Sequence, residues 1–221
     1  MNSFFLKTSK SISIIFLSLY LLSCNKQVIY TTEFNGKLDK KMWKIETESG
    51  TVFTKDGFLV LATKSGSTVW LNKKLKGNYK ITYQREVVLD AGVNDRLSDL
   101  NQFWMAQAKP FDRKGVFEEY DNTKLYYLGY GGNYNSTTRF RKYHGDGTKP
   151  VLTEFTDEKH LLKPNHTYTV VTIVQDGNIS CIVDGVKLVD YHDPQPIHKG
   201  YFGFRTTWSR QRIGYVKIEK M

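Results

Sequence analysis

Short runs in which apolar and polar residues alternate predict that this chain is built of β-strands. Turn-forming residues separate the runs, and Asp56-Gly57, Asp176-Gly177 and Asp184-Gly185 are strong hairpin signals. Strands are expected over residues 51–53, 58–63, 69–75, 79–89, 101–108, 151–155, 168–175, 178–183, 186–191, 201–207 and 213–219. No stretch shows sustained helical periodicity. Many short strands with almost no helix indicate an all-β, two-sheet sandwich without a second domain.

The N-terminus differs from the strand-rich remainder. Lys7 and Lys10 precede an apolar run over residues 12–22 that ends in Leu21-Leu22-Ser23-Cys24. This pattern is typical of a bacterial secretory signal with a lipobox, and the apolar run is too short to span a membrane. An ordinary signal peptide with a chance cysteine is the alternative.

The lipobox sets the expected domain boundaries. We expect residues 1–23 to be a signal peptide, Cys24 to be lipidated, residues 24–30 to form a tether and residues 31–221 to form one catalytic domain. Acyl chains on Cys24 would make the membrane a partner. The expected location is the outer membrane, facing the periplasm.

Charge and cysteine content narrow the chemistry. The chain carries a formal charge of +10, and removal of Lys7 and Lys10 with the signal leaves 30 basic and 22 acidic residues, or +8. A basic exported protein suits anionic lipid or acidic polysaccharide. Nucleic acid is not expected, because no recognised binding motif is present. Cys181 would remain without a partner, which predicts a buried, inert thiol.

The hairpin expected over residues 125–145 is the richest in candidate chemistry. Gly131 and Gly132 allow the chain to turn, and the period of two places Arg139, Arg141 and Tyr143 on one face of the second strand. The hairpin also holds four further tyrosines, two asparagines and a histidine. Such a face suits an anionic ligand rich in hydroxyls, such as an acidic sugar. The alternative is that these residues lie on an ordinary solvent-exposed face of the strand, where tyrosine and arginine are common.

Elimination from a uronic acid requires these residue types. Its carboxylate must be neutralised by fixed donors while one group removes the C5 proton and another protonates the leaving oxygen at C4. The candidate catalytic residues are Tyr143 or His144 as the base and Tyr130 or Tyr134 as the acid, with His160 as a second base. The candidate substrate-binding residues are Arg139 and Arg141 for the carboxylate, assisted by Asn133, Asn135, Arg205 and Trp104. The reaction needs no redox cofactor, and no calcium or zinc ligand spacing is present.

Other features leave alternatives open. Trp104 and Trp208 are either stacking platforms for sugar rings or core residues, and the polar loop over residues 94–101 either lines a groove or is solvated. Hydrolysis requires two positioned carboxyls. Glu119 and Asp121 approach the Glu-x-Asp-x-x-Glu pattern of jelly-roll glucanases, but Lys124 replaces the third acid. A non-catalytic glycan-binding lipoprotein is the third alternative, and no protein partner is evident.

Several segments together resemble a known family. Residues 32–43 resemble the opening of concanavalin A-like jelly rolls, and residues 94–105, 126–143, 160–165 and 200–206 are similar to bacterial lipoproteins of that fold associated with polysaccharide utilisation. These lipoproteins are similar to polysaccharide lyases. The greatest resemblance is to ulvan-active oligosaccharide dehydratases, which implies removal of water from a terminal glucuronate to leave a 4,5-unsaturated uronate. Cleavage of a glycosidic bond by a polysaccharide lyase is the alternative.

Overall fold

The protein is described by a computed structural model, which covers residues 27–107 and 113–221. Its strands are β1 (Val28–Thr32), β2 (Trp43–Thr47), β3 (Gly50–Lys55), β4 (Phe58–Lys76), β5 (Tyr79–Val87), β6 (Leu100–Ala106), β7 (Lys124–Gly131), β8 (Thr137–His144), β9 (Val151–Phe155), β10 (Thr167–Gln175), β11 (Asn178–Val183), β12 (Val186–His192) and β13 (Lys199–Lys220). Three short helical turns complete the fold: η1 (Phe117–Tyr120), α1 (Gly132–Asn135) and η2 (Glu158–His160).

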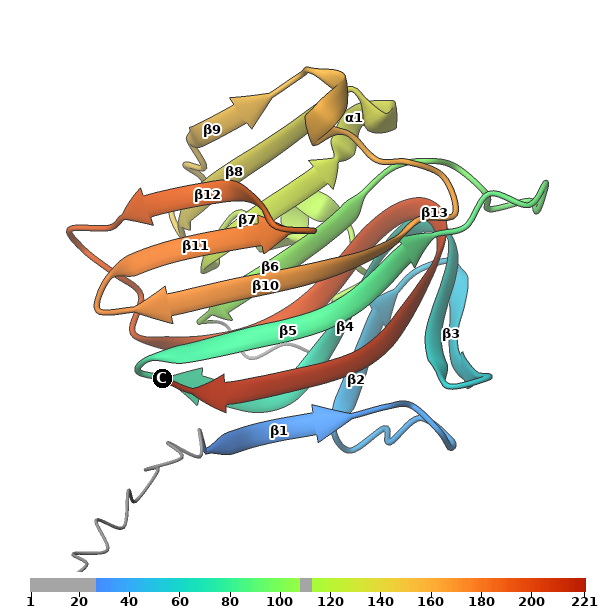
Figure 1. Cartoon of the computed structure of the whole chain (residues 1–221), viewed down its shortest axis with the longest axis horizontal. Coiled ribbons are helices and arrows are strands. Elements are labelled where there is room, and N and C mark those ends of the chain that lie inside the picture. Colours follow the sequence, from blue (N-terminus) through green and yellow to red (C-terminus); the bar gives the residue numbers. More distant parts are fainter. Residues whose placement is uncertain (1–26, 108–112) are drawn as a thin grey trace, which may run out of the picture.

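The strands form two layers of antiparallel sheet. In one layer β12, β11, β10 and β5 lie side by side and continue into the C-terminal part of β13, as Figure 1 shows. In the other, β4 pairs with the N-terminal part of β13, followed by β6, β7, β8 and β9. Two packed sheets with their inner faces buried form a β-sandwich.

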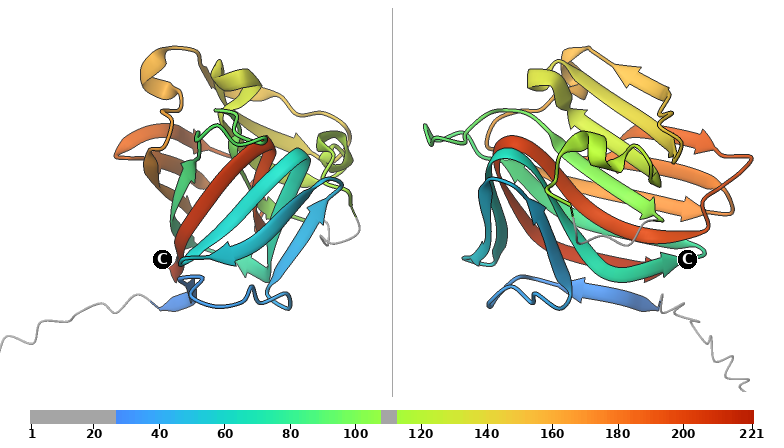
Figure 2. Two further views of the ribbon diagram at one scale, coloured as in Figure 1. Left: turned by 90° about the vertical axis from the view of Figure 1, so that its right-hand side faces the viewer. Right: turned by 180° about the vertical axis from the view of Figure 1, so that it is seen from behind.

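Two long strands join the layers. β4 and β13 each run through both sheets, and they pair with each other from Lys199–Lys76 to Ile213–Leu59 (Figure 2, left). The sequence predicted two strands in place of each. The polar and small residues at Ser65-Gly66-Ser67, and a shift of register between Thr207 and Ser209, interrupt the apolar alternation without ending the strand. Such a shift is a β-bulge, which bends a strand rather than stopping it.

The core between the layers is built of buried aromatic and aliphatic side chains. Alternate residues of each strand point inward, so that Phe202 and Phe204 of β13 are fully buried as predicted. Cys181 is also buried and unpaired, and burial raises the pKa of its thiol to about 12. That thiol therefore packs as a small apolar group.

The N-terminal predictions fall mostly outside this description. Cys24, the signal peptide and the start of the tether lie outside the described residues. The tether predicted over residues 24–30 is too long, because Val28 to Tyr30 already belong to β1 and pair with β13. Within residues 27–107 and 113–221, no helix is long and apolar enough to cross a membrane.

Candidate functional site

A pocket of about 340 Å³ lies on the outer face of the β6-β7-β8 layer; we call it the arginine pocket. One row of cross-strand pairs runs through it from Arg205 to Asn101, Gly129, Arg139 and Glu154. Directly paired residues project to the same face of a sheet. The register therefore brings side chains from five strands to one surface.

A second row runs beside the first, from Phe103 to Tyr127 and Arg141. A Cβ at Gly129 would lie only 2.4 Å from the Tyr127 hydroxyl oxygen, so the missing side chain leaves the space into which this phenol leans. Both Tyr127 and Gly129 line the pocket. The absence of a side chain at Gly129 thus leaves room for the hydroxyl group of Tyr127 at this position.

The Tyr127 phenol is a proton donor at neutral pH. Burial raises its pKa and the nearby Asp99 carboxylate raises it further, while Arg205 and Arg141 act in the opposite direction. Desolvation outweighs the two guanidinium groups, so the phenol keeps its proton.

The two predicted arginines lie together in the pocket but differ in their partners. The Nε of Arg139 forms an ion pair with Glu154, whose side chain is 40% exposed. The Nη1 of Arg141 donates to the carbonyl oxygen of Lys149 at 2.7 Å. Among the described residues no carboxylate pairs with Arg141. Of the described arginines that line the pocket, Arg141 is therefore the one whose charge no carboxylate neutralises.

The loop before β6 supplies the opposite wall. Asp99, in the left-handed region at φ 64°, accepts hydrogen bonds from Arg96 Nη2 at 2.7 Å and Asn101 Nδ2 at 3.0 Å. Asn101 is 2% exposed, and its Oδ1 is buried without a hydrogen-bond partner in the described structure. All three residues line the pocket. The loop over residues 94–101, for which two interpretations were open, thus borders the site.

The glycine-rich turn closes the pocket at the end of β7. Gly131, Asn133, Tyr134 and Asn135 all have φ between 53° and 64°, so the turn labelled α1 in Figure 1 is left-handed. Asn133 and the exposed Tyr134 line the pocket. Asn135 does not, because its amide side chain bonds both backbone groups of Leu162, at 2.7 and 2.9 Å. Its role is to hold the turn.

Arg205 lies on the predicted face but is buried beneath a covering segment. It is 1% exposed, and its Nη1 donates to the carbonyl oxygen of Gly115 at 2.8 Å. The ring of Phe117 lies 4.8 Å from the Arg205 guanidinium, and Tyr120 donates to the buried Glu46 at 2.8 Å. The segment over residues 113–120 therefore covers the part of this face formed by β2, β4 and β13, on the side seen from behind in Figure 2. Arg205 anchors the segment instead of contacting ligand directly.

A buried arginine supports the site from the core. Arg85 of β5 donates to the carbonyl oxygens of Asn101 at 2.6 Å and Arg205 at 2.8 Å, and to Gln211 Oε1 at 2.6 Å. Its pKa is lowered to about 10, chiefly by burial, so it remains charged at neutral pH. Arg85 thus ties β6 to β13 where the two strands diverge.

The structure corrects the placement of several predicted site residues. Trp104 is a core residue, stacked on Tyr126 and Phe140 with ring centroids 5.8 Å apart in both pairs. Tyr130 also faces the core, where it donates to the carbonyl oxygen of Leu161 at 3.1 Å. Because β7 alternates, the pocket receives its neighbours Tyr127 and Gly129 instead.

None of the predicted bases lines the arginine pocket. Tyr143 is fully buried, and burial raises the pKa of its phenol. The exposed His144 borders a different cavity, together with Lys124 and His198. His160 is held by Asp157 at 2.8 Å and stacks on Phe155.

The carboxylates that suggested a glucanase motif are not arranged for hydrolysis. Glu119 caps η1 by accepting from the Val116 amide at 3.0 Å, and Asp121 pairs with Lys149 at 2.6 Å. Neither lines the arginine pocket. Within the described part of the chain, no cluster of three or more His, Cys, Asp or Glu side chains is arranged to hold a metal ion.

Comparison with known proteins gives a family. Residues 61–216 match the model of a family described as a domain of unknown function, DUF6250. The chain belongs to this family. No curated protein matches the DUF6250 chain.

Solved structures share the fold of this DUF6250 domain. A Bacillus subtilis protein of unknown function with a galectin-like fold aligns with a TM-score of 0.72 and 16% identity, over 88% of this chain and 96% of that chain. The carbohydrate binding module CBM66 from Bacillus subtilis aligns with a TM-score of 0.58 and 14% identity, over 81% and 96%. An endo-β-1,3-glucanase from Pyrococcus furiosus aligns with a TM-score of 0.62 and 10% identity, over 88% and 94%. These likenesses confirm the predicted concanavalin A-like jelly-roll fold.

Tyr127, Arg96, Asp99 and Asn101 line the site but were not selected from the sequence. For Tyr127 a signal existed, because it precedes Gly129 by two residues and so shares its face. The loop over residues 94–101 was expected either to line a groove or to be solvated, but none of its residues was singled out, since only the fold brings Arg96, Asp99 and Asn101 beside β8.

Proposed function

We propose that the protein is a carbon–oxygen lyase that binds a uronate-bearing oligosaccharide in the arginine pocket. One observation carries the proposal: three arginines and a single carboxylate line this pocket, beside the phenols of Tyr127 and Tyr134. The net positive charge suits a sugar carboxylate, because charge-assisted bonds to guanidinium groups are strong and directional. Fold neighbours named as a carbohydrate binding module and a glucanase support a glycan ligand.

In the proposed reaction Arg141 binds the carboxylate of the uronate, with Arg139 beside it. Neutralising this group stabilises the negative charge that develops when the C5 proton leaves. The Asp99 carboxylate takes that proton, the C5–H electron pair becomes the C4=C5 double bond, and the C4–O bond breaks. Tyr127 protonates the departing oxygen, and a proton returns to it from Asp99 through solvent.

The covering segment favours action on a chain end. Phe117 lies at the wall of the pocket, and behind it the contact of Gly115 with Arg205 closes the face towards β4. A closed wall at this side leaves room for a terminal sugar rather than for the middle of a chain. Loss of a C4 hydroxyl from that terminal residue would make the protein a dehydratase, whereas an open subsite beyond C4 would make it a polysaccharide lyase.

Incubation with ulvan oligosaccharides tests the proposal. We expect absorbance of a 4,5-unsaturated uronate to rise, with a mass loss of one water and no fragmentation. Fragmentation with the same absorbance would assign a glycosidic-bond lyase. New reducing ends without absorbance would overturn elimination in favour of hydrolysis.

A non-catalytic glycan-binding protein is the second candidate. It is favoured by one observation: among the described residues no histidine lines the arginine pocket, and Asp99, the proposed base, already accepts hydrogen bonds from Arg96 and Asn101. Calorimetric titration with the same oligosaccharides separates the two candidates. Binding without any absorbance change supports the module.

Export and lipid anchoring at Cys24 complete the proposal. They rest on the sequence pattern alone. Labelling of the expressed protein with a radioactive fatty acid, compared with a Cys24→Ala variant, tests them.

A further inference from the structure

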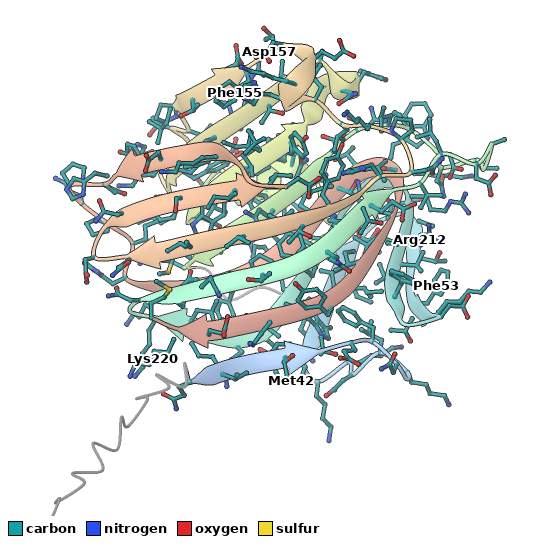
Figure 3. The ribbon with its side chains drawn as sticks, in the orientation of Figure 1. Met42, Phe53, Phe155, Asp157, Arg212 and Lys220 are labelled. Atoms are coloured by element: carbon teal, nitrogen blue, oxygen red, sulfur yellow. The ribbon has the colours of Figure 1, made fainter. Side chains whose placement is uncertain are left out.

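A second pocket, of about 580 Å³, lies where the β3–β4 hairpin, the end of β5 and β13 meet; we call it the phenylalanine pocket. Phe53 and Phe58 project from the hairpin, and Val60 and Val88 add further apolar surface. Phe53 is 41% exposed, so its ring is accessible from solvent. Figure 3 shows Phe53 and Arg212 on the same side of the molecule. The volume falls in the range of about 300–1,000 Å³ typical of small-molecule sites.

Charges in the phenylalanine pocket are balanced and locally paired. Three basic and three acidic side chains line it. Arg212 Nη2 pairs with Glu86 at 2.7 Å, and its guanidinium lies 5.4 Å from the centroid of the Phe58 ring. The Nε of Arg212 is buried without a hydrogen-bond partner in the described structure. Glu86 can accept hydrogen bonds and Arg212 can donate them, and Arg212 lies beside the Phe58 ring. Such a site matches the vicinal hydroxyls of an uncharged sugar ring, which both donate and accept, better than it matches an anion.

The two pockets lie on one continuous face of the β4–β13 ribbon. On β4, Thr68 accepts a hydrogen bond from Arg205 and so lies on the face of the arginine pocket. Ala62 and Val60 are an even number of residues away, project to the same side of β4 and line the phenylalanine pocket. On β13 the register shift at Trp208 changes the alternation, so that the face passes from Thr207 in the arginine pocket to Arg210 in the phenylalanine pocket. Along a strand this step is about 10 Å.

Trp208 is the single β13 residue between the two registers of the β13–β4 pairing, opposite Lys64 and Ser65 of β4. Its φ is 42°, and its indole is 44% exposed. The guanidinium of Arg96, which lines the arginine pocket, lies 5.3 Å from the indole ring and 4.7 Å from the Tyr134 ring. Bulges commonly redirect a side chain beside a functional site. Here the bulge places an aromatic platform between the two pockets.

We propose that Trp208 and the phenylalanine pocket bind uncharged sugar units of the same oligosaccharide whose uronate occupies the arginine pocket. The inference rests on the proposed function. It adds a second recognition region that measures chain length and selects uncharged units, through aromatic stacking and the Arg212–Glu86 pair.

Calorimetric titration with three probes tests it: glucuronic acid, and desulfated, uronate-terminated ulvan oligosaccharides of two and six units. We expect the hexasaccharide to bind about tenfold more tightly than the disaccharide, as stacking on one or two rings would give. Phe53→Ala and Trp208→Ala should each remove most of that gain. Phe53→Ala should leave the affinity for glucuronic acid unchanged, and Val93→Ala, which alters an apolar side chain 80% exposed outside both pockets, should change nothing.

The outcomes separate this inference from the proposed function. Absence of binding by all three probes would overturn the proposed function. Binding of glucuronic acid with equal affinities for the di- and hexasaccharide would overturn only the second region. The second region would also be overturned if both Phe53→Ala and Trp208→Ala still bound the hexasaccharide about tenfold more tightly than the disaccharide. Thermal unfolding of each variant verifies that it is folded.

Discussion

The arginine pocket and the phenylalanine pocket both use guanidinium groups, but among the described residues only the arginine pocket has one, Arg141, that no carboxylate pairs with. In the phenylalanine pocket Arg210 is paired with Asp95 by two bonds of 2.7 and 2.8 Å, and Arg212 is paired with Glu86. In the arginine pocket Arg141 contacts a backbone carbonyl, and no described carboxylate pairs with it. The two arginines of the phenylalanine pocket are therefore neutralised before any ligand binds, whereas Arg141 of the arginine pocket is not.

From this difference we infer that the pairing of the arginines, more than their number, sets the class of ligand that each pocket binds. An arginine paired with a carboxylate orders its surroundings and presents neutral hydrogen-bonding groups. An arginine bonded only to a carbonyl keeps a charge that an anion can neutralise. The comparison predicts separable effects of mutation and solvent on the two pockets.

Removal of the unpaired charge should have the largest effect. Arg141→Ala is expected to lower kcat/KM for uronate elimination by about a hundredfold or more, since loss of one preorganised donor costs about 10²–10³ in rate. The absorbance of the unsaturated product measures it. Lys64→Ala, which removes an exposed charge outside both pockets, is the matched control. Loss of less than threefold would contradict the role given to Arg141.

Removal of the pocket phenol should affect rate and spare binding. Tyr127→Phe is expected to lower kcat by about a hundredfold, which is the usual contribution of a general acid, with little change in affinity. Tyr143→Phe is the matched control, because Tyr143 is a fully buried tyrosine of the same sheet face whose hydroxyl has no hydrogen-bond partner in the described structure. Equal losses in the two variants would show that Tyr127 is not the proton donor.

The loop between the pockets should make stability pH-dependent. Burial alone would raise the pKa of Asp95, but hydrogen bonds from Arg210 and from the amides of Gly92 and Asp90 outweigh it and hold the pKa below its ordinary value. Since the folded pKa is lowered, the contribution of Asp95 is complete above its unfolded pKa and disappears as the pH falls through the folded value.

Asp95→Asn should therefore destabilise the protein at neutral pH by about 2 kcal/mol, the scale of a charged hydrogen-bond network. Thermal unfolding of both proteins from pH 7 to pH 3 measures this difference. The gap between wild type and variant should narrow below about pH 4. A gap that stays constant would mean that Asp95 has the same pKa in the folded and the unfolded protein, and would contradict the lowered pKa.

Salt should have the smallest effect and act on one pocket only. Between low salt and 0.15 M, affinity for glucuronic acid is expected to fall by roughly threefold, because screening weakens attraction between exposed charges. The ratio of hexasaccharide to disaccharide affinity should stay constant, as expected of apolar stacking. A ratio that falls with salt would indicate that the second region also recognises charge.

Much of the fold followed from alternation along the chain, and the exceptions have local causes. The hairpins at Asp176-Gly177 and Asp184-Gly185 lie where predicted, because a tight turn depends only on adjacent residues. The continuity of β4 and β13 was missed, since small polar residues and a bulge resemble chain breaks when neighbouring strands are unknown. Of the tyrosines in the 125–145 hairpin, only Tyr127 and Tyr134 line the arginine pocket.

The sequence by itself determined the all-β class, the shared face of Arg139 and Arg141 and the inward direction of Phe202 and Phe204, because the period of two is a local property of a strand. Only the tertiary structure decided which residues meet those arginines. Register across β6, β7 and β8 placed Asn101 and Tyr127 beside them, and the covering segment buried Arg205. Register and covering depend on contacts between residues far apart in the chain, and one sequence carries no direct record of those contacts.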